Sequence, residues 1–459
     1  MKKVYVIIVL GISVYAFSRC NKSAAFPEDG YDDRLSGGSF TTLDASTQAF
    51  KQAIDGLSER QERVHTIGDG TFDQVFVAAP APHFGGLGPI FNNISCINCH
   101  RNDGGGFPST GSSNSGLLMR ISIPGVDAHG GPLAAPGFGL QIQDQALLGA
   151  TPEAGTTITY SDLPVTYPDG TVVTLHQPSY ALKNPYLALP GNYMLSPRLA
   201  PKLVGMGLLE NIPESTILSF VDAGDKNADG ITGKANYVYD PFTAKTEIGR
   251  FGLKANTATL LVQVATAYQQ DMGVTSYPTP LESAAGQSQW TPSADDKEPE
   301  LVDSLLNYVV FYVQTLAVPA RRDVLDSTNK RGAILFNQAN CSGCHRTTMY
   351  TGVNTAINLS SQRIHPYTDL LLHDLGDALG DNRPDFLATG NEWRTPPLWG
   401  LGMLAKTNGG SAYFLHDGRA RSIEEAILWH GGEATKSKQA FMQLNKADRA
   451  ALLKFLGSL

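Results

Sequence analysis

The sequence predicts a mainly α-helical fold with loop-rich regions, built from two related units of which the first is enlarged by an insertion. Three observations lead to this prediction. The pentapeptide Cys-x-x-Cys-His occurs twice, amphipathic segments flank its second copy, and a nine-residue pattern recurs downstream of each copy. With 459 residues and 42% apolar side chains, the chain can form two or three domains with cores of their own.

The two pentapeptides are Cys96–His100 and Cys341–His345. A Cys-x-x-Cys pair alone also occurs in redox-active and zinc-binding proteins, but the histidine that follows at once is typical of covalent haem attachment. The sulfurs add to the haem vinyl groups and the imidazole becomes the proximal iron ligand. The sequence therefore predicts two c-type haems: haem 1 on Cys96, Cys99 and His100, and haem 2 on Cys341, Cys344 and His345.

The chain around the second motif predicts the helices of a cytochrome c unit. Gly332–Phe336 precedes Cys341 at the spacing of the first cytochrome c helix, with a small residue for a helix crossing and an aromatic residue for the haem. Near the end of the chain, Asn445 can cap a helix whose apolar residues run from Leu452 to Leu456. We therefore expect a C-terminal cytochrome c-like domain over residues 325–459.

The first unit is expected to be longer and richer in loops. An N-terminal extension over residues 20–84 precedes the predicted N-terminal haem domain, residues 85–324. Within that domain, turn residues at Tyr167–Gly170 predict a hairpin, and the apolar periodicity of Lys297–Val318 predicts a helix.

The nine-residue pattern P-x-L-x-G-x-G-x-L occurs at Pro201–Leu209 and at Pro396–Leu404. The first copy starts 201 − 100 = 101 residues after its proximal histidine, and the second starts 396 − 345 = 51 residues after its own. Chance similarity is the alternative. If the copies are related, each should cover one face of its own haem, and the first unit carries an insertion of 101 − 51 = 50 residues.

The first unit also contains Asp225, Asn227 and Asp229, directly before Gly230. Oxygen-bearing side chains at alternate positions before a glycine are typical of an EF-hand-type calcium loop. The glutamate expected at the twelfth position is replaced by Asn236. Both a calcium site formed by the first three residues and a solvated turn are compatible with this pattern.

The first residues predict export from the cytoplasm. Lys2 and Lys3 precede the apolar run Val4–Phe17, which is typical of a signal peptide and short for a membrane-spanning helix. We expect a signal peptide over residues 1–19 and a periplasmic or outer-membrane-anchored protein. Cys20 resembles the lipid-bearing cysteine of bacterial lipoproteins, with ordinary cleavage nearby as the alternative. Membrane contact is expected only through such a lipid.

Several further motifs resemble the bacterial di-haem oxidoreductase family, often described as thiol-oxidoreductase-like. They are Gly86–Phe91, Ser196–Leu203, Gly249–Lys254, Pro366–His373, Glu392–Gly400 and Leu415–Gly432. The resemblance implies a distant relation to the bacterial di-haem cytochrome c peroxidases. It also implies an exported oxidoreductase of peroxidase type whose partners are a small electron-donor protein or cytochrome and peroxide or another small oxidant. The net charge of −8 argues against a nucleic-acid partner.

The resemblance also implies the distal ligands. In the relatives a His-Asp-Gly turn and a short helix lead to the distal ligand of the C-terminal haem, and the matching position here is His430, with His373 as the runner-up. We therefore expect haem 2 to be bound by His345 and His430, and to accept electrons. The matching stretch of the first half, Ile212–Leu218, has no following histidine, which predicts an open haem 1. His416 is expected to contact a haem propionate or to lie between the haems.

Peroxide cleavage needs a proton-transferring group near the open iron, and the relatives use a glutamate. Here we expect Glu210 to move the proton and Arg198 to stabilise charge on the departing oxygen, with a plain structural ion pair as the alternative. Three tryptophans near haem 2 are candidates for electron relay or for core packing: Trp393, Trp399 and Trp429. The alternative function is a non-catalytic electron-transfer cytochrome with two six-coordinate haems.

Overall fold

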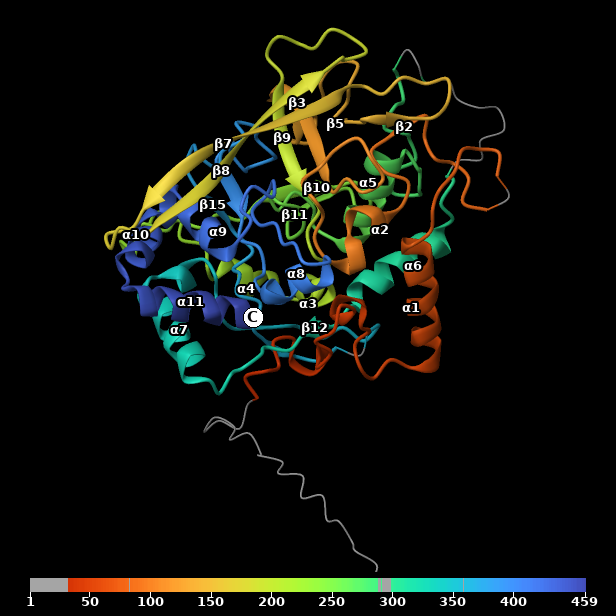
Figure 1. Ribbon diagram of the computed structural model, residues 1–459. Coiled ribbons are helices and arrows are strands. Elements are labelled where there is room, and N and C mark those ends of the chain that lie inside the picture. Colours follow the sequence, from red (N-terminus) through yellow and green to blue (C-terminus); the bar gives the residue numbers. More distant parts are fainter. Residues whose placement is uncertain (1–31, 82, 288–289, 291–298, 358) are drawn as a thin grey trace, which may run out of the picture. The chain divides into compact units, whose positions relative to one another are not determined.

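Two pairs of crossed helices organise the fold (Figure 1). Helix α7 (Ser327–Gln338) crosses α11 (Lys446–Ser458), and α1 (Glu59–Phe72) crosses α6 (Asp303–Gln314). These elements belong to a computed structural model that describes residues 32–81, 83–287, 290, 299–357 and 359–459. The predicted signal peptide and Cys20 lie outside the described residues.

Both helices predicted around the second motif are confirmed. Asp326 caps α7 by accepting a hydrogen bond from the Asn329 amide. Asn445 caps α11 in the same way, with its side-chain oxygen 3.0 Å from the amide nitrogen of Asp448. The helix predicted over Lys297–Val318 is observed as α6.

The α1–α6 pair has the same construction as the α7–α11 pair. The Phe336 ring of α7 lies 6.4 Å from the His345 ring, and the Phe72 ring of α1 lies 6.2 Å from the His100 ring. Each Cys-x-x-Cys-His motif therefore has its own helix pair, with an aromatic residue of the pair beside the motif histidine.

The expectation of a mainly α-helical fold is wrong. The protein has 28% helix and 21% strand, and its strands form many small sheets. Most of the missed strands lie in the stretch that the sequence suggests is rich in loops. Strand β3 (Leu117–Val126) pairs with β4 (Pro132–Leu133), β5 (Gln141–Ile142) and β9 (Met194–Leu199). Leu117 and Ile121 of β3 share a buried core with Leu199 of β9, and strands so distant in sequence are not revealed by a local periodicity.

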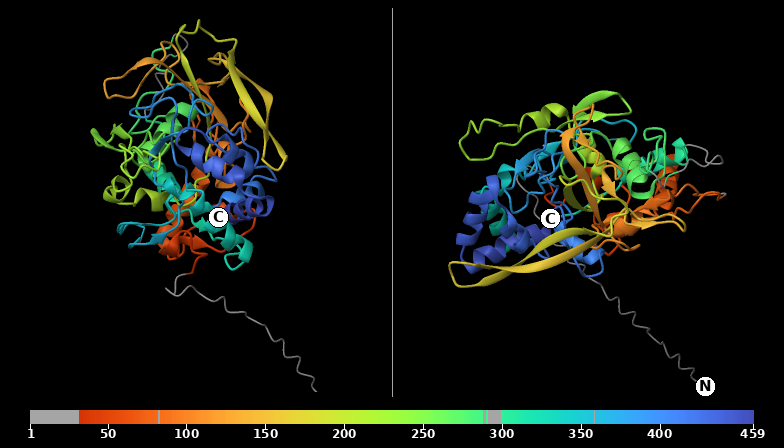
Figure 2. Two further views of the ribbon diagram at one scale, coloured as in Figure 1. Left: turned by 90° about the vertical axis from the view of Figure 1, so that its left-hand side faces the viewer. Right: turned by 90° about the horizontal axis from the view of Figure 1, so that it is seen from above.

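The predicted hairpin is confirmed and is much longer than expected. Strands β7 (Gly155–Thr166) and β8 (Val172–Lys183) pair along their whole length, with Val165 opposite Val173. They form a ribbon that runs from the region of β3 toward helices α9 and α10 (Figures 1 and 2). At its tip the Tyr167 hydroxyl donates to Glu424 over 2.7 Å. The insertion thus packs on the C-terminal half of the chain.

The remaining elements are short, apart from α5. The helices are α2 (Cys96–Cys99), α3 (Met206–Glu210), α4 (Glu214–Leu218), α5 (Leu260–Met272), α8 (Leu404–Thr407), α9 (Ile423–Trp429) and α10 (Thr435–Gln443). The two-stranded sheets are β1 (Thr41–Thr42) with β12 (Val318–Pro319), β2 (Ile90–Phe91) with β6 (Gln145–Ala146), β10 (Tyr237–Asp240) with β11 (Lys245–Ile248), β13 (Met349–Tyr350) with β14 (Arg363–Ile364), and β15 (Leu372–Asp374) with β16 (Glu392–Arg394). No helix of the described part of the chain is long and apolar enough to cross a membrane.

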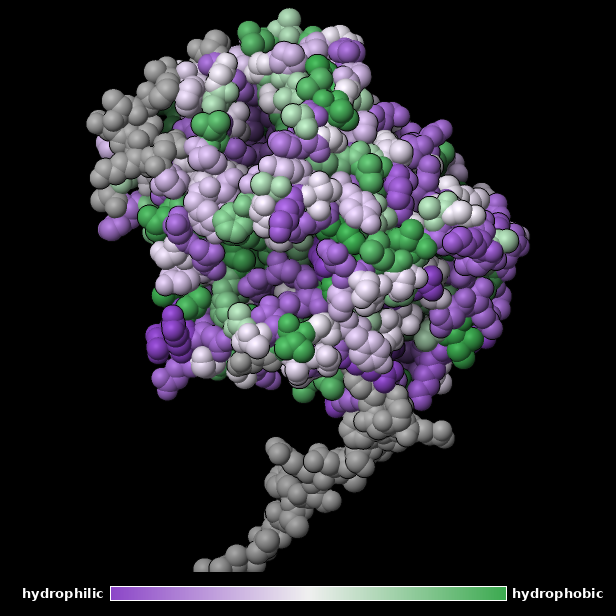
Figure 3. Space-filling view, turned by 180° about the vertical axis from the view of Figure 1, so that it is seen from behind, coloured by the Kyte–Doolittle hydropathy of each residue, from purple (hydrophilic) through white to green (hydrophobic). Residues whose placement is uncertain are grey.

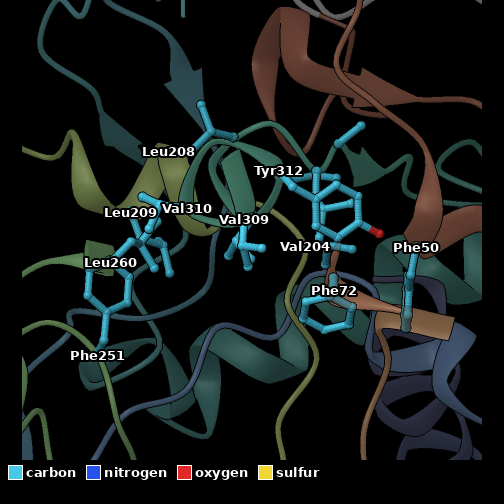
Figure 4. Packing of buried hydrophobic residues seen from close by; sticks show 14 of the residues in the cluster. Phe50, Phe72, Val204, Leu208, Leu209, Phe251, Leu260, Val309, Val310 and Tyr312 are labelled. Carbon is cyan, nitrogen blue, oxygen red and sulfur yellow. The ribbon is translucent and has the colours of Figure 1, made fainter. Parts of the chain in front are cut away.

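The largest apolar core surrounds α6 (Figure 4). Val204, Val309 and Tyr312 are buried in it together with Phe72, and the first motif packs against it through Cys96. A second core lies between α7 and α11. On the face of the molecule that Figure 3 shows, hydrophobic side chains are scattered among hydrophilic ones, which is ordinary for a folded protein.

The two copies of the nine-residue repeat contact corresponding helices of the two helix pairs. A Cβ at Gly207 would stand 2.1 Å from the Gln314 carbonyl oxygen in α6, and a Cβ at Gly402 would stand 1.9 Å from the Gly457 carbonyl oxygen in α11. Each copy therefore packs its second glycine on the second helix of its own pair. The copies also touch each other, since Gly205 lies directly against Trp399.

Candidate haem sites

A tight turn presents the reactive groups of the second motif. Asn340 ends the loop after α7 in a left-handed conformation, with φ 56°, and a short turn over Cys341–Gly343 follows. The His345 amide then donates to the Cys341 carbonyl over 3.0 Å. This turn places two sulfurs and one imidazole beside the same cavity.

The cavity encloses about 270 Å³ and has mainly apolar walls. Its functional lining comprises Cys341, Cys344, His345, His373, Trp393, Arg394, His416 and His430, with Lys202 from the first half of the chain. Thiols, imidazoles and an apolar wall at one place are the groups that a covalently held haem requires. The residues present therefore fit haem 2.

Two histidines line the cavity with one ring nitrogen uncommitted. His345 has its Nδ1 2.9 Å from the Tyr367 carbonyl, and His430 has its Nδ1 2.7 Å from the Ala426 carbonyl. In that arrangement Nδ1 is the donor, and the Nε2 lone pair is available to iron. Burial lowers the pKa of His345 to about 4, with charge repulsion from His430 adding to the shift. Burial also lowers the pKa of His430, so both rings are neutral, as an iron ligand must be.

His373, the runner-up ligand, uses both of its ring nitrogens. Its Nε2 lies 2.8 Å from Asp369 and its Nδ1 lies 2.8 Å from Glu433. Burial lowers the pKa of His373, but the hydrogen bonds to these carboxylates outweigh that effect and raise the pKa well above its ordinary value. The result is a buried imidazolium 3.5 Å from the Cys344 sulfur, with no nitrogen free for iron. His430 stays the predicted distal ligand.

Trp393 is the one of the three tryptophans that lines the cavity. Its ring stacks on His416, with centroids 3.8 Å apart and planes 10° apart, and its indole N–H donates to the Leu379 carbonyl. Trp399 is buried where the two repeat copies touch, and Trp429 lies under the Arg419 guanidinium. Trp399 and Trp429 are therefore packing residues in this structure.

The first motif repeats the geometry of the second. Helix α2 carries both sulfurs, and the His100 amide donates to the Cys96 carbonyl over 2.9 Å. The His100 Nδ1 lies 2.8 Å from the carbonyl oxygen of Pro201, and burial lowers the pKa of this imidazole. Burial also raises the pKa of the Cys96 thiol to about 12 and that of Cys99 still further. The donor set fits haem 1.

Glu210 and Arg198 are held by different partners. The Glu210 carboxylate accepts hydrogen bonds from the Leu260 amide at the start of α5, over 2.7 Å, and from the Gln314 side chain, over 2.6 Å. Arg198 is buried, with Nε 2.6 Å from the Ser196 hydroxyl, and it lies beside the carboxylates of Asp381 and Asp385. The ion pair considered as their alternative role does not form between them among the described residues. Their catalytic roles stay predictions.

The side chains of the predicted calcium loop contact the backbone of the loop itself. Asp225 accepts from the Gly230 amide over 3.1 Å, and Asp229 accepts from the Ile231 amide over 2.8 Å. Asn227 accepts from the Asp229 amide over 3.0 Å. Within the described ranges, no three or more His, Cys, Asp or Glu side chains are grouped as a metal site. Calcium stays a prediction.

Sequence reasoning missed the helix pair of the first motif. Helix α1 falls in the predicted N-terminal extension, to which the sequence assigned no chemistry, yet its Phe72 lies beside His100. A signal was present, since Gly68 and Phe72 of α1 have the spacing of Gly332 and Phe336 of α7.

The protein has two turns that carry a Cys-x-x-Cys-His motif. Each turn lies beside its own helix pair, and each holds its imidazole through Nδ1. These are the features of a di-haem protein. The chain belongs to the family described as "di-haem oxidoreductase, putative peroxidase", whose family model matches residues 31–459. The family resemblance inferred from the sequence is thereby confirmed. The description also supports an oxidoreductase of peroxidase type.

A search of curated proteins found no match. Among solved structures, hydrazine synthase of Kuenenia stuttgartiensis under xenon pressure is similar over part of its length. It shares 17% identity, with 36% of this chain and 57% of that chain covered and a TM-score of 0.24. A similarity at this level carries no argument.

Proposed function

We propose that the protein is an exported di-haem c-type cytochrome oxidoreductase of peroxidase type, in which electrons enter at haem 2 and pass to an open haem 1. One observation carries the proposal: His345 and His430 line the same cavity with their Nε2 atoms uncommitted. Two imidazoles suit an iron that transfers electrons without binding substrate.

When bound, the haems supply electron transfer and the reduction of peroxide or another small oxidant. The chain holds haem 2 through the sulfurs of Cys341 and Cys344, and the Tyr367 carbonyl fixes the orientation of His345. Haem 1 is held in the same way by Cys96 and Cys99 with His100. The wall of the haem 2 cavity is mainly apolar, which suits the faces of a haem.

The catalytic part of the proposal concerns haem 1. The stretch Ile212–Leu218, which matches the region of the distal ligand in the second half, contains no histidine, and this favours an iron with an open position. Glu210 would move a proton between the oxygens of the oxidant, and Arg198 would stabilise the charge that develops on the departing oxygen.

The proposal includes the cellular setting and the partners. Haem attachment to Cys-x-x-Cys-His fits the export that the apolar run Val4–Phe17 predicts, with the mature chain periplasmic or anchored by a lipid on Cys20. A small electron-donor protein or cytochrome would reduce haem 2. We also propose that Asp225, Asn227 and Asp229 bind calcium, because their oxygen-bearing side chains alternate along the loop as in an EF-hand.

The purified holoprotein provides the test. Mass spectrometry should find two covalently bound haems, and optical and EPR spectra should contain a high-spin signal, at least after one-electron reduction. Hydrogen peroxide should then be consumed in the presence of a reduced donor. Two low-spin haems in every redox state, without peroxide turnover, would contradict the proposal and favour the electron-transfer cytochrome.

A further inference from the structure

Three cationic side chains line the haem 2 cavity without forming an ion pair with a described residue: Lys202, Arg394 and Lys438. Lys202 donates from Nζ to the Pro397 carbonyl over 2.7 Å. Arg394 is only 9% exposed and donates to the carbonyls of Gly252, over 2.9 Å, and Thr395, over 3.2 Å. No ion pair is formed by Lys202 or Arg394 with any described residue.

Two buried cations outside the cavity, Lys254 and Arg198, are matched by acids. Lys254 has its Nζ 2.7 Å from Asp381, and Arg198 lies between Asp381 and Asp385. At the cavity the situation differs. Burial lowers the pKa of Lys202 to about 7, with repulsion from Arg394 adding to the shift. Burial also lowers the pKa of Arg394 to about 10, although the negative charge of Asp369 acts against this shift. An anion placed between Lys202 and Arg394 would stabilise the charged forms of both side chains.

A haem bound in the cavity would itself supply such an anion. A haem carries two carboxylate groups, and charge-assisted hydrogen bonds from a lysine and an arginine satisfy such groups well. His373 is not available for this purpose, because Asp369 and Glu433 already engage it. Lys438, which also lines the cavity, lies on α10 near the predicted distal ligand His430.

Lys202 reaches this cavity from the other half of the chain. It follows Pro201, the residue whose carbonyl oxygen lies 2.8 Å from Nδ1 of His100, the predicted proximal ligand of haem 1. Pro201 also lines the haem 2 cavity. One hydrogen bond and one residue of backbone therefore separate the proximal histidine of haem 1 from a cation on the wall of the haem 2 site.

We propose that Lys202 and Arg394 bind the carboxylate groups of haem 2, and that Lys202 is the link through which haem 2 is coupled to the proximal histidine of haem 1. In the coupled step one electron would pass from ferrous haem 2, which would become ferric, to ferric haem 1, which would become ferrous. The inference rests on haem 2 being bound at Cys341–His345, as the proposed function states.

The first experiment compares the holoprotein with Lys202→Met, Lys202→Arg and, as a control, Lys330→Met, whose lysine is exposed on α7. Loss of a cation favours the ferric haem, so the midpoint potential of haem 2 should fall in Lys202→Met. We expect a shift of about tenfold in the ferrous-to-ferric equilibrium, or about 59 mV for one electron. The resonance Raman band of the haem propionates should shift as well. Lys202→Arg should stay close to the wild type, as should the control.

A second readout follows electron transfer directly. After rapid one-electron reduction of haem 2, the rate at which haem 1 is reduced should fall several-fold in Lys202→Met and recover in Lys202→Arg. Potentials and Raman bands equal to those of the control would overturn the carboxylate site, and an unchanged rate would overturn the coupling. The haem count and peroxide turnover are measured on the same samples, so a failure of the proposed function is seen separately.

Discussion

Gly332 of α7 lies against Ala451 of α11 so closely that a Cβ on Gly332 would stand 2.1 Å from the Ala451 carbonyl oxygen. The other helix pair has the same contact, since a Cβ on Gly68 of α1 would stand 2.2 Å from the Tyr308 carbonyl oxygen in α6. In both pairs a glycine lets two helix backbones approach directly. One turn later in each first helix, a phenylalanine lies beside the motif histidine.

Replacing Gly332 by valine should separate α7 from α11. The added side chain would overlap the Ala451 carbonyl, and overpacking of this kind costs about 1–3 kcal/mol in the free energy of unfolding. Urea unfolding followed by circular dichroism measures the loss. Gly457→Ala in α11 is the control, because nothing lies within 4 Å of its added methyl group, and it should keep or gain up to about 1 kcal/mol. Equal effects of the two changes would show that the crossing is not tight.

The sequence predicted one helix pair and missed the other for a reason of spacing. In the second unit Phe336 precedes Cys341 by 341 − 336 = 5 residues, so helix and motif are read together. In the first unit Phe72 precedes Cys96 by 96 − 72 = 24 residues, and the partner helix α6 lies more than two hundred residues further on. Only tertiary packing brings these parts together.

The sequence did not predict the strands of the first half or the presence of Lys202 at haem 2, and both failures have the same cause. The strands of the first half are held by partners far away in the chain, as when β9 returns to pair with β3. Likewise, Lys202 belongs to the repeat copy that is expected to cover haem 1, yet it lines the cavity of the second motif. Local patterns predicted the motif turns and the helix caps, where the interacting residues are neighbours in sequence. They could not predict which half of the chain completes a site.

The tip of the β7–β8 ribbon should be anchored by Tyr167. Its buried ring packs with Phe441 and lies under the Arg449 guanidinium, while its hydroxyl donates to Glu424. Tyr167→Ala should cost about 3–5 kcal/mol in the free energy of unfolding, as for other large buried side chains. Tyr167→Phe removes only the hydrogen bond and should cost about 1 kcal/mol. Denaturant unfolding measures both, and a phenylalanine variant as unstable as the alanine variant would contradict the packing role.

The Glu433–His373 pair should make stability depend on pH. Burial raises the pKa of Glu433, but hydrogen bonds from His373 and Thr232 outweigh it and lower the pKa to about 2. The stabilisation is therefore present above the ordinary glutamate value of 4.5 and is lost as the pH falls toward 2. For His373 the pKa is raised, so its contribution is complete below 6.5 and is lost only as the pH rises through the higher folded value.

Glu433→Gln should accordingly be less stable than the wild type by about 1.5–3 kcal/mol at pH 6. That difference should shrink between pH 4.5 and pH 2, where the wild-type carboxylate becomes protonated. Unfolding by urea at a series of pH values measures it. Glu59→Gln, at a glutamate on the surface of α1, should show no such trend. A difference that stays constant down to pH 2 would rule out the ionised pair.

Calcium binding at the loop of Asp225 can be tested without reference to activity. Isothermal titration of the chelator-treated holoprotein with Ca²⁺ should give a binding isotherm, and the unfolding temperature should rise with Ca²⁺ concentration by mass action. Asp225→Asn combined with Asp229→Asn should abolish both effects, because two charged oxygen ligands are lost. Asp127→Asn, in the turn between β3 and β4, is the control. A wild-type titration without binding heat or thermal shift would leave the loop as a solvated turn.

His430→Ala tests the predicted distal ligand of haem 2. The imidazole lines the cavity with Nδ1 held by the Ala426 carbonyl, so its removal should leave the iron with His345 alone. The low-spin optical and EPR signals of haem 2 should then change to high-spin, and added imidazole should restore them by binding in the space left. His129→Ala, which removes an exposed ring stacked on Tyr239, should leave both spectra unchanged. If haem 2 stays low-spin in His430→Ala without added imidazole, another side chain is the sixth ligand. His373 could take that place only by giving up its contact with Asp369 or Glu433, so the double variant with His373→Gln would then decide between the two histidines.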